Sequence, residues 1–495
     1  MGPRAWTSMG MGLAVALHAC GGEDGVGPGE CSPGVARVEL DARAGRTTIP
    51  RIGDGLRITA SAVDECDRAV AIPSTLWTSD DPSVVEARSV IAITGEQVSE
   101  VPGEGFAQAV GFGATVVRAE VQGVVGALPV EVVRPPTRGE GLELLGGDSV
   151  ARGTTDLWVH GAYAYTGTSV GACGVLSVPC SSVPGSLVVW RLDPDKVPSV
   201  VDSVRLPGPH TNDVKVSPRG DYLVASQEAN AATNGVVVLD LADPAAPVVI
   251  AHFTDGLENG VHNVWIEPID GTDYLFVVED GGGAQHGLHV LDLSDPSDPR
   301  RVARYAGGDS QVHDVYVRDG LAFVSHWDDG LVILDVGHGV RGGSPSAPVL
   351  VSELQMAGGN THNAWYWPEA ALVFVGEERL SATADSTDVG RLHVVDVSDL
   401  SAPVEIASYR IPGETPHNFW LDEENGVLYA AWYDRGVRVL DVKGTLAGDL
   451  AGREIGFLEP SASRGLGSIW APQLHEGVLY LSDRVHGVWA VRPVG

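Results

Sequence analysis

The sequence is poor in positive charge, and it has no apolar segment long enough for a membrane-spanning helix. Its 495 residues contain 32 Lys+Arg against 65 Asp+Glu, which gives a formal net charge of -33. Such an acidic chain repels phosphate backbones, so we expect no nucleic-acid partner. The apolar stretch Met9–Leu17 is too short to stay in a bilayer as a spanning helix.

Several motifs of well-understood chemistry are also missing. The sequence has no Gly-x-Ser-x-Gly turn, no glycine loop for phosphates or dinucleotides, and no acidic Ca²⁺ loop. Among its 5 cysteines no two have Cys-x-x-Cys spacing, which argues against a zinc site built from them. These absences remove common hydrolase, nucleotide-binding and zinc-knuckle sites from consideration.

The N-terminus has the features of an export signal. Arg4 precedes the apolar stretch, which ends in Leu17-His18-Ala19-Cys20-Gly21. This ending resembles the lipobox of bacterial lipoproteins, in which the cysteine receives lipid and becomes the first residue. The resemblance implies a signal peptide at 1–19, lipidation at Cys20 and a membrane partner reached through that lipid anchor. It also implies an extracytoplasmic place in the cell envelope, on a bacterial outer membrane or cell surface. An ordinary cleaved signal is the alternative, because His18 is uncommon in this motif.

The remaining cysteines predict disulfides. Lipid on Cys20 leaves an even number that can pair in an oxidising compartment. Cys31 and Cys66 form one predicted pair, and Cys173 and Cys180, which bracket a single loop, form the other. Free buried thiols are the alternative. Residues 20–35 are rich in glycine, proline and acidic residues, which predicts a flexible tether.

Short alternating apolar patterns between residues 36 and 134 predict a β-sandwich. The segment Leu76–Ala87, together with GFGATVVRAEVQGVVG from Gly111, resembles bacterial Ig-like domains of the second type. This resemblance implies that Trp77 packs in the core and that the domain is a spacer or adhesion module. Two prolines then predict a stiff linker at 135–141.

From Leu142 onward, a unit of roughly 50 residues occurs seven times, and a period of this length indicates a propeller or solenoid. The most regular text in the units is GVVVLDLADPAAP from Gly235, GLHVLDLSDPSDP from Gly287 and GRLHVVDVSDLSAP from Gly390. These strings resemble the LVIVD repeat, a bacterial β-propeller family. The resemblance extends over 142–495 and implies the fold without implying one activity.

The number and closure of the blades follow from the two ends of the repeat region. The last unit provides only three strands, whereas Leu142–Ser149 matches the end of an ordinary fourth strand, including the shared Gly-Gly-Asp-Ser. The N-terminal strand is therefore expected to complete the last blade. The predicted fold is all-β, with an Ig-like β-sandwich followed by a seven-bladed β-propeller over 142–495.

Four consecutive units have a histidine, followed by Asn or Asp, at the start of their first strand. These histidines are His262, His313, His362 and His417. The first strands of a propeller line its central channel, so the histidines are expected to gather at one mouth. Clustered imidazoles suit a divalent transition metal, which makes these residues the predicted metal ligands. The alternative is a polar ring that lines the channel, and we expect the following Asn or Asp to be structural.

The ends of the second strands are expected at the same mouth, where they would ligate directly or orient the imidazoles. This predicted second ring consists of Gln227, Glu279, His326, Glu377 and Asp483. Aromatic residues at matching offsets on the first strands are expected to wedge between blades, namely Trp265, Tyr316, Trp365, Trp367, Trp420 and Trp470.

Two classes of function are compatible with this sequence. The first is an exported, lipid-anchored platform that binds a protein or carbohydrate ligand, as rigid propeller faces often do. The second is a metal-dependent enzyme, an oxidoreductase being one option, with the histidine cluster at its centre. Because no catalytic motif is present, the sequence favours binding over catalysis.

Overall fold

The computed structural model describes most of the chain after residue 33. The described residues are 34–42, 45, 47–49, 55–94, 97–133, 137–148, 150, 153–169, 185–192, 194–229, 231–279, 287–308, 310–379, 389–459 and 468–494. Their regular structure is strand, apart from two short 3-10 helices, η4 (Pro368–Ala370) and η5 (Ala451–Arg453). None of the helices within these ranges has the length and apolarity needed to cross a membrane. The predicted all-β class is confirmed.

The cysteine predictions fall mostly outside these ranges. Cys66 is disulfide-bonded. Cys20, Cys31, Cys173 and Cys180, and with them the lipidation site and the predicted pairings, lie outside the described residues.

The first domain is a pair of sheets that share one core. One sheet has the order β1-β3-β7-β6 with β4 on β3, and the other has the order β2-β9-β8-β5. Strand β3 buries every second residue, as a sheet with one wet face requires. Trp77 is 6% exposed and packs with Ile58 and Val117 from the two sheets. The strands are β1 (Arg37–Ala42), β2 (Thr48–Ile49), β3 (Gly55–Val63), β4 (Ala69–Val70), β5 (Leu76–Ser79), β6 (Val85–Thr94), β7 (Gln97–Ala109), β8 (Gly113–Val121) and β9 (Val124–Val132).

The rest of the described chain, from Arg138 to Pro493, forms seven sheets of four or five strands, and neighbouring strands are antiparallel except for β31 and β35. Each begins with an inner strand; these are β12 (Thr154–His160), β16 (Val214–Val216), β20 (Val261–Ile269), β24 (Asp314–Arg318), β28 (Thr361–Trp367), β32 (Phe419–Asp422) and β37 (Ile469–His475). The second strands are β13 (Tyr163–Thr168), β17 (Tyr222–Gln227), β21 (Thr272–Glu279), β25 (Leu321–His326), β29 (Leu372–Glu377), β33 (Val427–Ala431) and β38 (Val478–Asp483).

The outer half of each sheet repeats in the same way. The third strands are β14 (Ser186–Leu192), β18 (Gly235–Asp240), β22 (Gly287–Asp292), β26 (Gly330–Asp335), β30 (Leu392–Asp396), β34 (Val437–Asp441) and β39 (Gly487–Pro493). The fourth strands are β15 (Pro198–Arg205), β19 (Val248–Phe253), β23 (Arg300–Tyr305), β27 (Val349–Leu354), β31 (Val404–Tyr409), β36 (Glu454–Glu459) and β11 (Leu142–Asp148).

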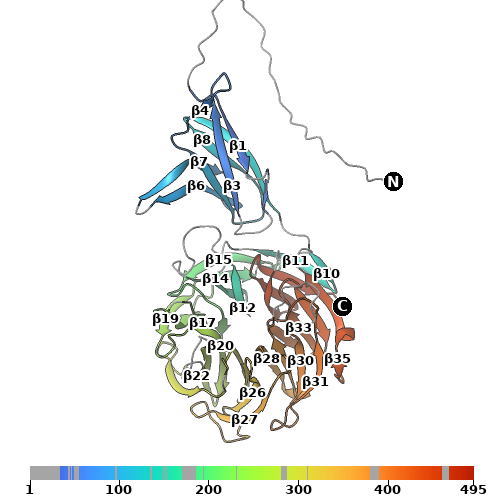
Figure 1. Ribbon diagram of the computed structural model, residues 1–495. Helices are drawn as coiled ribbons and strands as arrows, with labels where there is room; N and C mark the ends of the chain where they lie inside the picture. The colour runs from blue at the N-terminus through green and yellow to red at the C-terminus, as the bar shows by residue number, and fades with distance from the viewer. Residues whose placement is uncertain are drawn as a thin grey trace, which may run out of the picture.

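The sheets close into a ring. Each inner strand contacts the inner strand of the next sheet, and β37 contacts β12 to complete the circle. Figure 1 shows the sheets placed around a central axis, with the first domain at the side of the ring. This arrangement is a β-propeller, which confirms that part of the predicted fold.

The third strands explain why their sequence is so regular. In β18 five successive residues are buried, because the strand lies between neighbouring sheets and has no solvent face. The Asp-Pro text after it forms a turn in which the Asp243 carboxylate accepts a hydrogen bond of 3.0 Å from the Ala245 N–H. The sequence repeat therefore reflects burial first and turn chemistry second.

The predicted closure by the N-terminal strand is confirmed. Strand β11 pairs antiparallel with β39, from Leu142 opposite Pro493 to Asp148 opposite Val488. The short strand β10 (Arg138–Glu140) pairs with β36, so part of the segment predicted as linker belongs to a propeller sheet. Another short strand, β35 (Gly448–Asp449), pairs with β31. These additions cover two outer edges that would otherwise present unpaired backbone groups.

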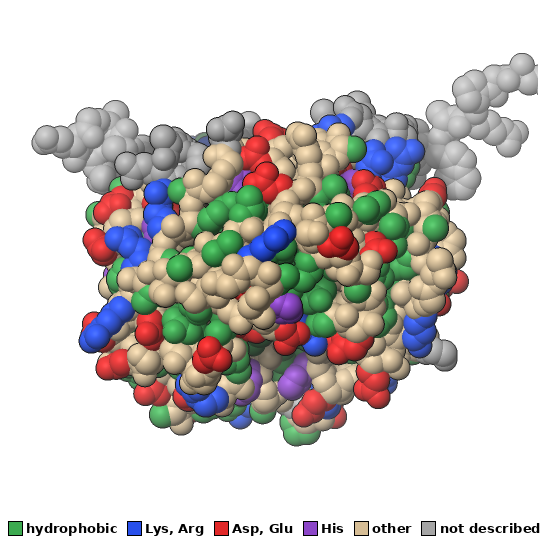
Figure 2. Space-filling view, turned by 90° about the horizontal axis from the view of Figure 1, so that it is seen from below, with side chains coloured by type: hydrophobic (Ala, Val, Ile, Leu, Met, Phe, Trp, Pro, Cys, Tyr) green, Lys and Arg blue, Asp and Glu red, His purple; other side chains and the backbone are tan. Residues whose placement is uncertain are grey.

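The rim of the propeller is mixed in character. Outer strands expose single apolar side chains, such as Val248 at 63% and Val404 at 57%. In Figure 2 apolar, acidic and basic side chains alternate over this rim, without a continuous basic field.

Candidate metal centre

The four predicted histidines meet at one mouth of the central channel. His262 and His362 are the second residues of β20 and β28, and His313 and His417 just precede β24 and β32. Their ring centroids form a continuous series, 4.5 Å from His262 to His313, 4.4 Å from His313 to His362 and 4.3 Å from His362 to His417. Residues that are about 50 positions apart in sequence thus form one cluster.

Local irregularities help to aim these side chains. The register of β20 with β21 shifts between Val261 and Val264, and that of β28 with β29 shifts between Thr361 and Asn363. A bulge adds a residue on one strand and turns its side chains away from simple alternation. Each of these two shifts brackets or adjoins a histidine of the cluster.

Hydrogen bonds fix the tautomer of two of the imidazoles. Nδ1 of His313 donates to the carbonyl of His362 at 3.1 Å, and Nδ1 of His417 donates to the carbonyl of Trp470 at 2.8 Å. A carbonyl can only accept, so Nδ1 holds the proton in both rings when they are neutral. Nε2 then has a free lone pair, which is the arrangement of a histidine ready to bind a metal.

The other two rings have different surroundings. Nδ1 of His262 lies 3.1 Å from a carboxylate oxygen of Glu228, and the Asn212 amide lies 3.4 Å from its Nε2. Nδ1 of His362 is buried and has no hydrogen-bond partner among the residues that the structure describes. A buried polar atom without a partner is costly, and it is the kind of atom that a bound ligand would satisfy.

Burial favours the neutral form of three of the four imidazoles, those of His313, His362 and His417. Burial lowers the pKa of His313 and of His417 well below the ordinary histidine value, and the neighbouring imidazoles lower both further. Burial also lowers the pKa of His362, against an opposing effect of the Glu378 carboxylate. A neutral imidazole is the form that binds metal, so no proton has to leave these rings near neutral pH.

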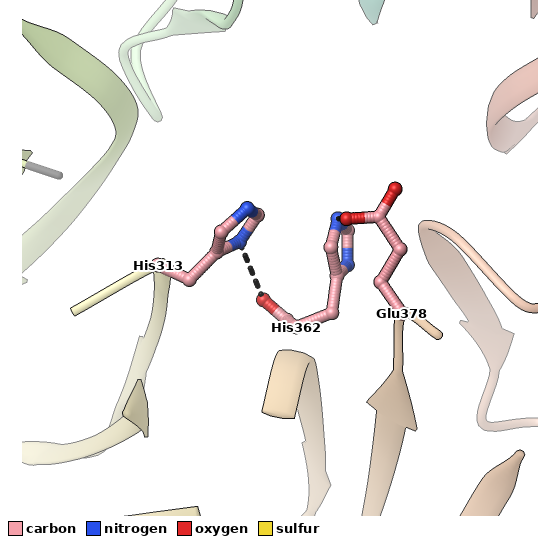
Figure 3. A group of neighbouring side chains, drawn as sticks. All are labelled: His313, His362 and Glu378. Atoms are coloured by element: carbon pink, nitrogen blue, oxygen red, sulfur yellow. Dashed lines mark hydrogen bonds and ion pairs between the residues drawn. The ribbon is translucent and has the colours of Figure 1, made fainter. Parts of the chain in front are cut away.

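A carboxylate joins the cluster from the next strand. Oε2 of Glu378 lies 3.9 Å from Nε2 of His362, and the ligand atoms of His313, His362 and Glu378 all lie within 4.8 Å of one another. Figure 3 shows the two imidazoles and this carboxylate on adjacent elements around a common space. The other Glu378 oxygen accepts a short hydrogen bond from the Tyr433 hydroxyl.

The predicted second ring does not join the histidines. The side chain of Gln227 binds the Gly208 N–H and the Thr211 hydroxyl, both at 2.7 Å. Glu279 accepts hydrogen bonds from Asn259 at 3.0 Å and pairs with His289 at 3.1 Å. Both residues therefore hold a loop, and Glu279 also holds a third strand.

The other three members of that ring have the same kind of role. Glu377 accepts from the Gly358 N–H at 2.8 Å, Asp483 pairs with His486 at 2.9 Å, and His326 makes a short contact with the Gly307 carbonyl. For four of the five, the next residue reaches the mouth, namely Glu228, Trp327, Glu378 and Arg484. The residue after Glu279 lies outside the described residues. Tyr433 also reaches the mouth, beside His417. Successive residues of a strand point to opposite faces, so the prediction is corrected by one residue.

The Asn or Asp at the start of an inner strand, one position after the histidine in four of the units, forms hydrogen bonds to the neighbouring sheet. The Asn263 amide donates to the His313 carbonyl at 3.1 Å, and Asp213 accepts from the Val264 N–H at 2.9 Å. These bonds satisfy backbone groups at buried strand starts. The predicted structural role is confirmed at these two positions.

Below the mouth the channel is nearly filled. A cavity of about 60 Å³ remains there. Lys215 lines this cavity together with Asp213 and Asp156. Its Nζ is in short contact with Asp213, 3.3 Å from Asp156 and 5.2 Å from the ring of Trp158. Burial alone would lower the pKa of Lys215, but Asp213 and Asp156 outweigh it and raise that pKa. Lys215 was not among the site residues predicted from the sequence. The signal was a lysine at the start of an inner strand, in a chain with few cations.

An aromatic belt lines the cavity beside this level. Its members touch in series, with centroid distances of 4.5 Å from Trp265 to Tyr316, 4.9 Å from Tyr316 to Trp365 and 5.1 Å from Trp365 to Trp420. Trp265, Tyr316, Trp365 and Trp420, which we expected to wedge between blades, therefore line the cavity.

Three segments of the chain match a known family of repeats. The LVIVD repeat model matches residues 271–306, 307–355 and 387–411. Among solved structures, the β-propeller domain of Cps50 (Swd1) from Myceliophteria thermophila is similar at 12% sequence identity and a TM-score of 0.47, covering 70% of this chain and 98% of that chain. No curated protein matches the sequence.

Proposed function

We propose that this protein binds a divalent transition metal at the channel mouth through His262, His313, His362 and His417. The observation that carries the proposal is the continuous contact of four imidazoles, two of which hold their Nδ1 proton on a neighbouring carbonyl. Imidazole suits zinc, copper, nickel and ferrous iron, whereas Ca²⁺ and Mg²⁺ prefer oxygen ligands.

The carboxylates nearby support a divalent ion. Glu378 is close enough to His362 to become a further ligand after a small movement, and Glu228 orients His262. Such outer partners fix imidazole orientation and raise ligand basicity. The two negative charges of Glu378 and Glu228 would also balance the charge of a buried M²⁺ ion.

Elemental analysis of untagged protein tests the proposal. We expect one equivalent of metal per chain after dialysis against metal-free buffer, and its loss in a His313→Ala, His362→Ala double variant. The matched control is His338→Ala, since His338 is exposed and lies in a turn outside the cluster. Metal-free wild-type protein that also fails to take up Zn²⁺ or Co²⁺ would contradict the proposal.

We propose as a second function that the face around the mouth is a platform for a protein or carbohydrate ligand. The half-buried indoles of Trp327 and Trp470 favour it, because they lie beside His313 and His417 where a sugar ring could stack. Quenching of tryptophan fluorescence by soluble oligosaccharides would test this, with Trp327→Ala expected to reduce the change. An unchanged spectrum across a broad oligosaccharide panel would count against a carbohydrate ligand.

The remaining proposals concern organisation and location. We propose that the seven sheets are the seven blades of one propeller, that the first domain is an Ig-like spacer, and that lipid on Cys20 anchors the protein in the cell envelope. The strand order supports the first, the two-sheet core the second, and the lipobox-like sequence the third. Incorporation of labelled fatty acid that disappears in a Cys20→Ala variant would support the anchor.

A further inference from the structure

Arg484 lies beside the histidine cluster without belonging to it. It follows β38, and its backbone N–H donates to the Ser468 carbonyl at 2.9 Å, which holds the turn against the start of the last inner strand. Its guanidinium carbon lies 4.5 Å from the ring centroid of Trp470, and that ring lies 3.8 Å from the ring of His417. The side chain is half-buried.

No carboxylate pairs with this guanidinium in the described part of the chain. Glu378 and Glu228 at the mouth have other partners, since Glu378 accepts the Tyr433 hydroxyl and Glu228 pairs with His262. A half-buried guanidinium that rests on an aromatic face and pairs with no acid has its hydrogen-bond donors available.

The charge of Arg484 is felt inside the cluster. It contributes to the lowered pKa of His417, after burial and the effect of His362, and it opposes the raised pKa of the Tyr433 hydroxyl. The mouth therefore carries the fixed positive charge of Arg484 as well as the carboxylates of Glu378 and Glu228.

Resting on the proposed metal site, we propose that the mouth binds a small carboxylate ligand, with one carboxylate oxygen on the metal and the carboxylate group held by Arg484. The planar guanidinium presents paired N–H donors that match a carboxylate, and Trp470 restricts its orientation. The positive guanidinium beside the metal position favours an anion there over a neutral ligand.

The test uses the full-length untagged protein loaded with Co²⁺, whose visible absorption reports on its ligands. Acetate is the carboxylate probe, and imidazole is the neutral probe for the same open metal position. In Arg484→Gln we expect unchanged Co²⁺ binding, unchanged imidazole binding, and acetate binding weaker by about ten- to hundredfold, the range for a lost charge-assisted hydrogen bond. Arg484→Lys keeps the positive charge but lacks the paired N–H donors of the guanidinium. Its acetate affinity is expected to lie between those of wild type and Arg484→Gln.

The outcomes separate this inference from the metal proposal. If wild-type protein binds Co²⁺ and acetate leaves the spectrum unchanged, or if Arg484→Gln weakens acetate and imidazole equally, the carboxylate assignment is overturned and the metal site stands. Inorganic phosphate that binds through Arg484 while acetate does not would also overturn it. Failure of Co²⁺ to bind before any anion is added removes both proposals. Melting curves monitor folding, and Arg484→Lys provides the comparison if Arg484→Gln is unstable.

Discussion

Two polar layers of the same channel, separated by one or two residues in sequence, differ in almost every respect. The lower layer, built around Lys215, Asp213 and Asn263, uses its polar atoms on backbone groups and on one another. Within the described residues, the histidine layer above leaves Nε2 of His313 and of His417 with a free lone pair, and Nδ1 of His362 without a partner. The lower layer leaves one such atom, Oδ1 of Asn363. The histidine layer gathers several open nitrogen atoms in one place, and this difference is the physical reason to propose binding by the histidines.

The largest effect is expected from removing the built-in cation of the lower layer. In Lys215→Met the buried Asp213 and Asp156 lose their counter-charge, so the free energy of unfolding should fall by about 3–5 kcal/mol. Urea unfolding at neutral pH measures this. The double variant Lys215→Met, Asp213→Asn removes one stranded charge and should recover part of the loss. A single variant as stable as wild type would show that Lys215 is not needed as a counter-ion.

The histidine layer should respond in the opposite way. We expect His313→Asn to lower metal affinity by about a hundredfold, comparable with the losses seen when metal-site groups are altered. Its free energy of unfolding should change by less than about 1 kcal/mol, because asparagine can still donate to the His362 carbonyl. Competition with a chromophoric chelator gives the affinity and urea unfolding gives the stability. A large loss of stability with unchanged affinity would reverse the roles assigned to the two layers.

The smallest effect concerns Glu267, near the opposite end of the channel from the histidines. Burial raises the pKa of its carboxyl to about 7, and the Asp319 N–H, which donates to it at 3.1 Å, only partly opposes this. Between its ordinary value of 4.5 and about 7 the folded protein keeps a proton that the unfolded chain has lost, so stability falls as pH rises through this window.

Glu267→Gln should remove that fall. Allowing for solvent screening of a partly exposed group, we expect the variant to be more stable than wild type by about 1 kcal/mol at pH 8 and to differ little at pH 4. Thermal unfolding across this pH range provides the measurement. A difference between the two proteins that does not change with pH would exclude the titration of Glu267 as its cause.

Some of this organisation could be predicted from the sequence, because aligned positions of the repeated units occupy equivalent places around the ring. Once the units were aligned, His262 and His417 had to share a mouth, and Leu142–Ser149 had to complete the last sheet. The strand-end residues were harder. Glu377 and Glu378 are adjacent, and only their side-chain directions show that the first holds a loop while the second faces His362.

The sequence by itself determined the β-propeller, the closure of its last sheet and the four histidines at one mouth, because periodic text and buried strands constrain the backbone. Tertiary structure alone decided which neighbour of each strand end faces the histidines, that Lys215 lies in the channel, and that Arg484 stacks on Trp470 near His417 without an acidic partner among the described residues. Those features depend on bulges and on the alternation of side chains across a twisted sheet, which fix directions that a one-dimensional pattern does not contain.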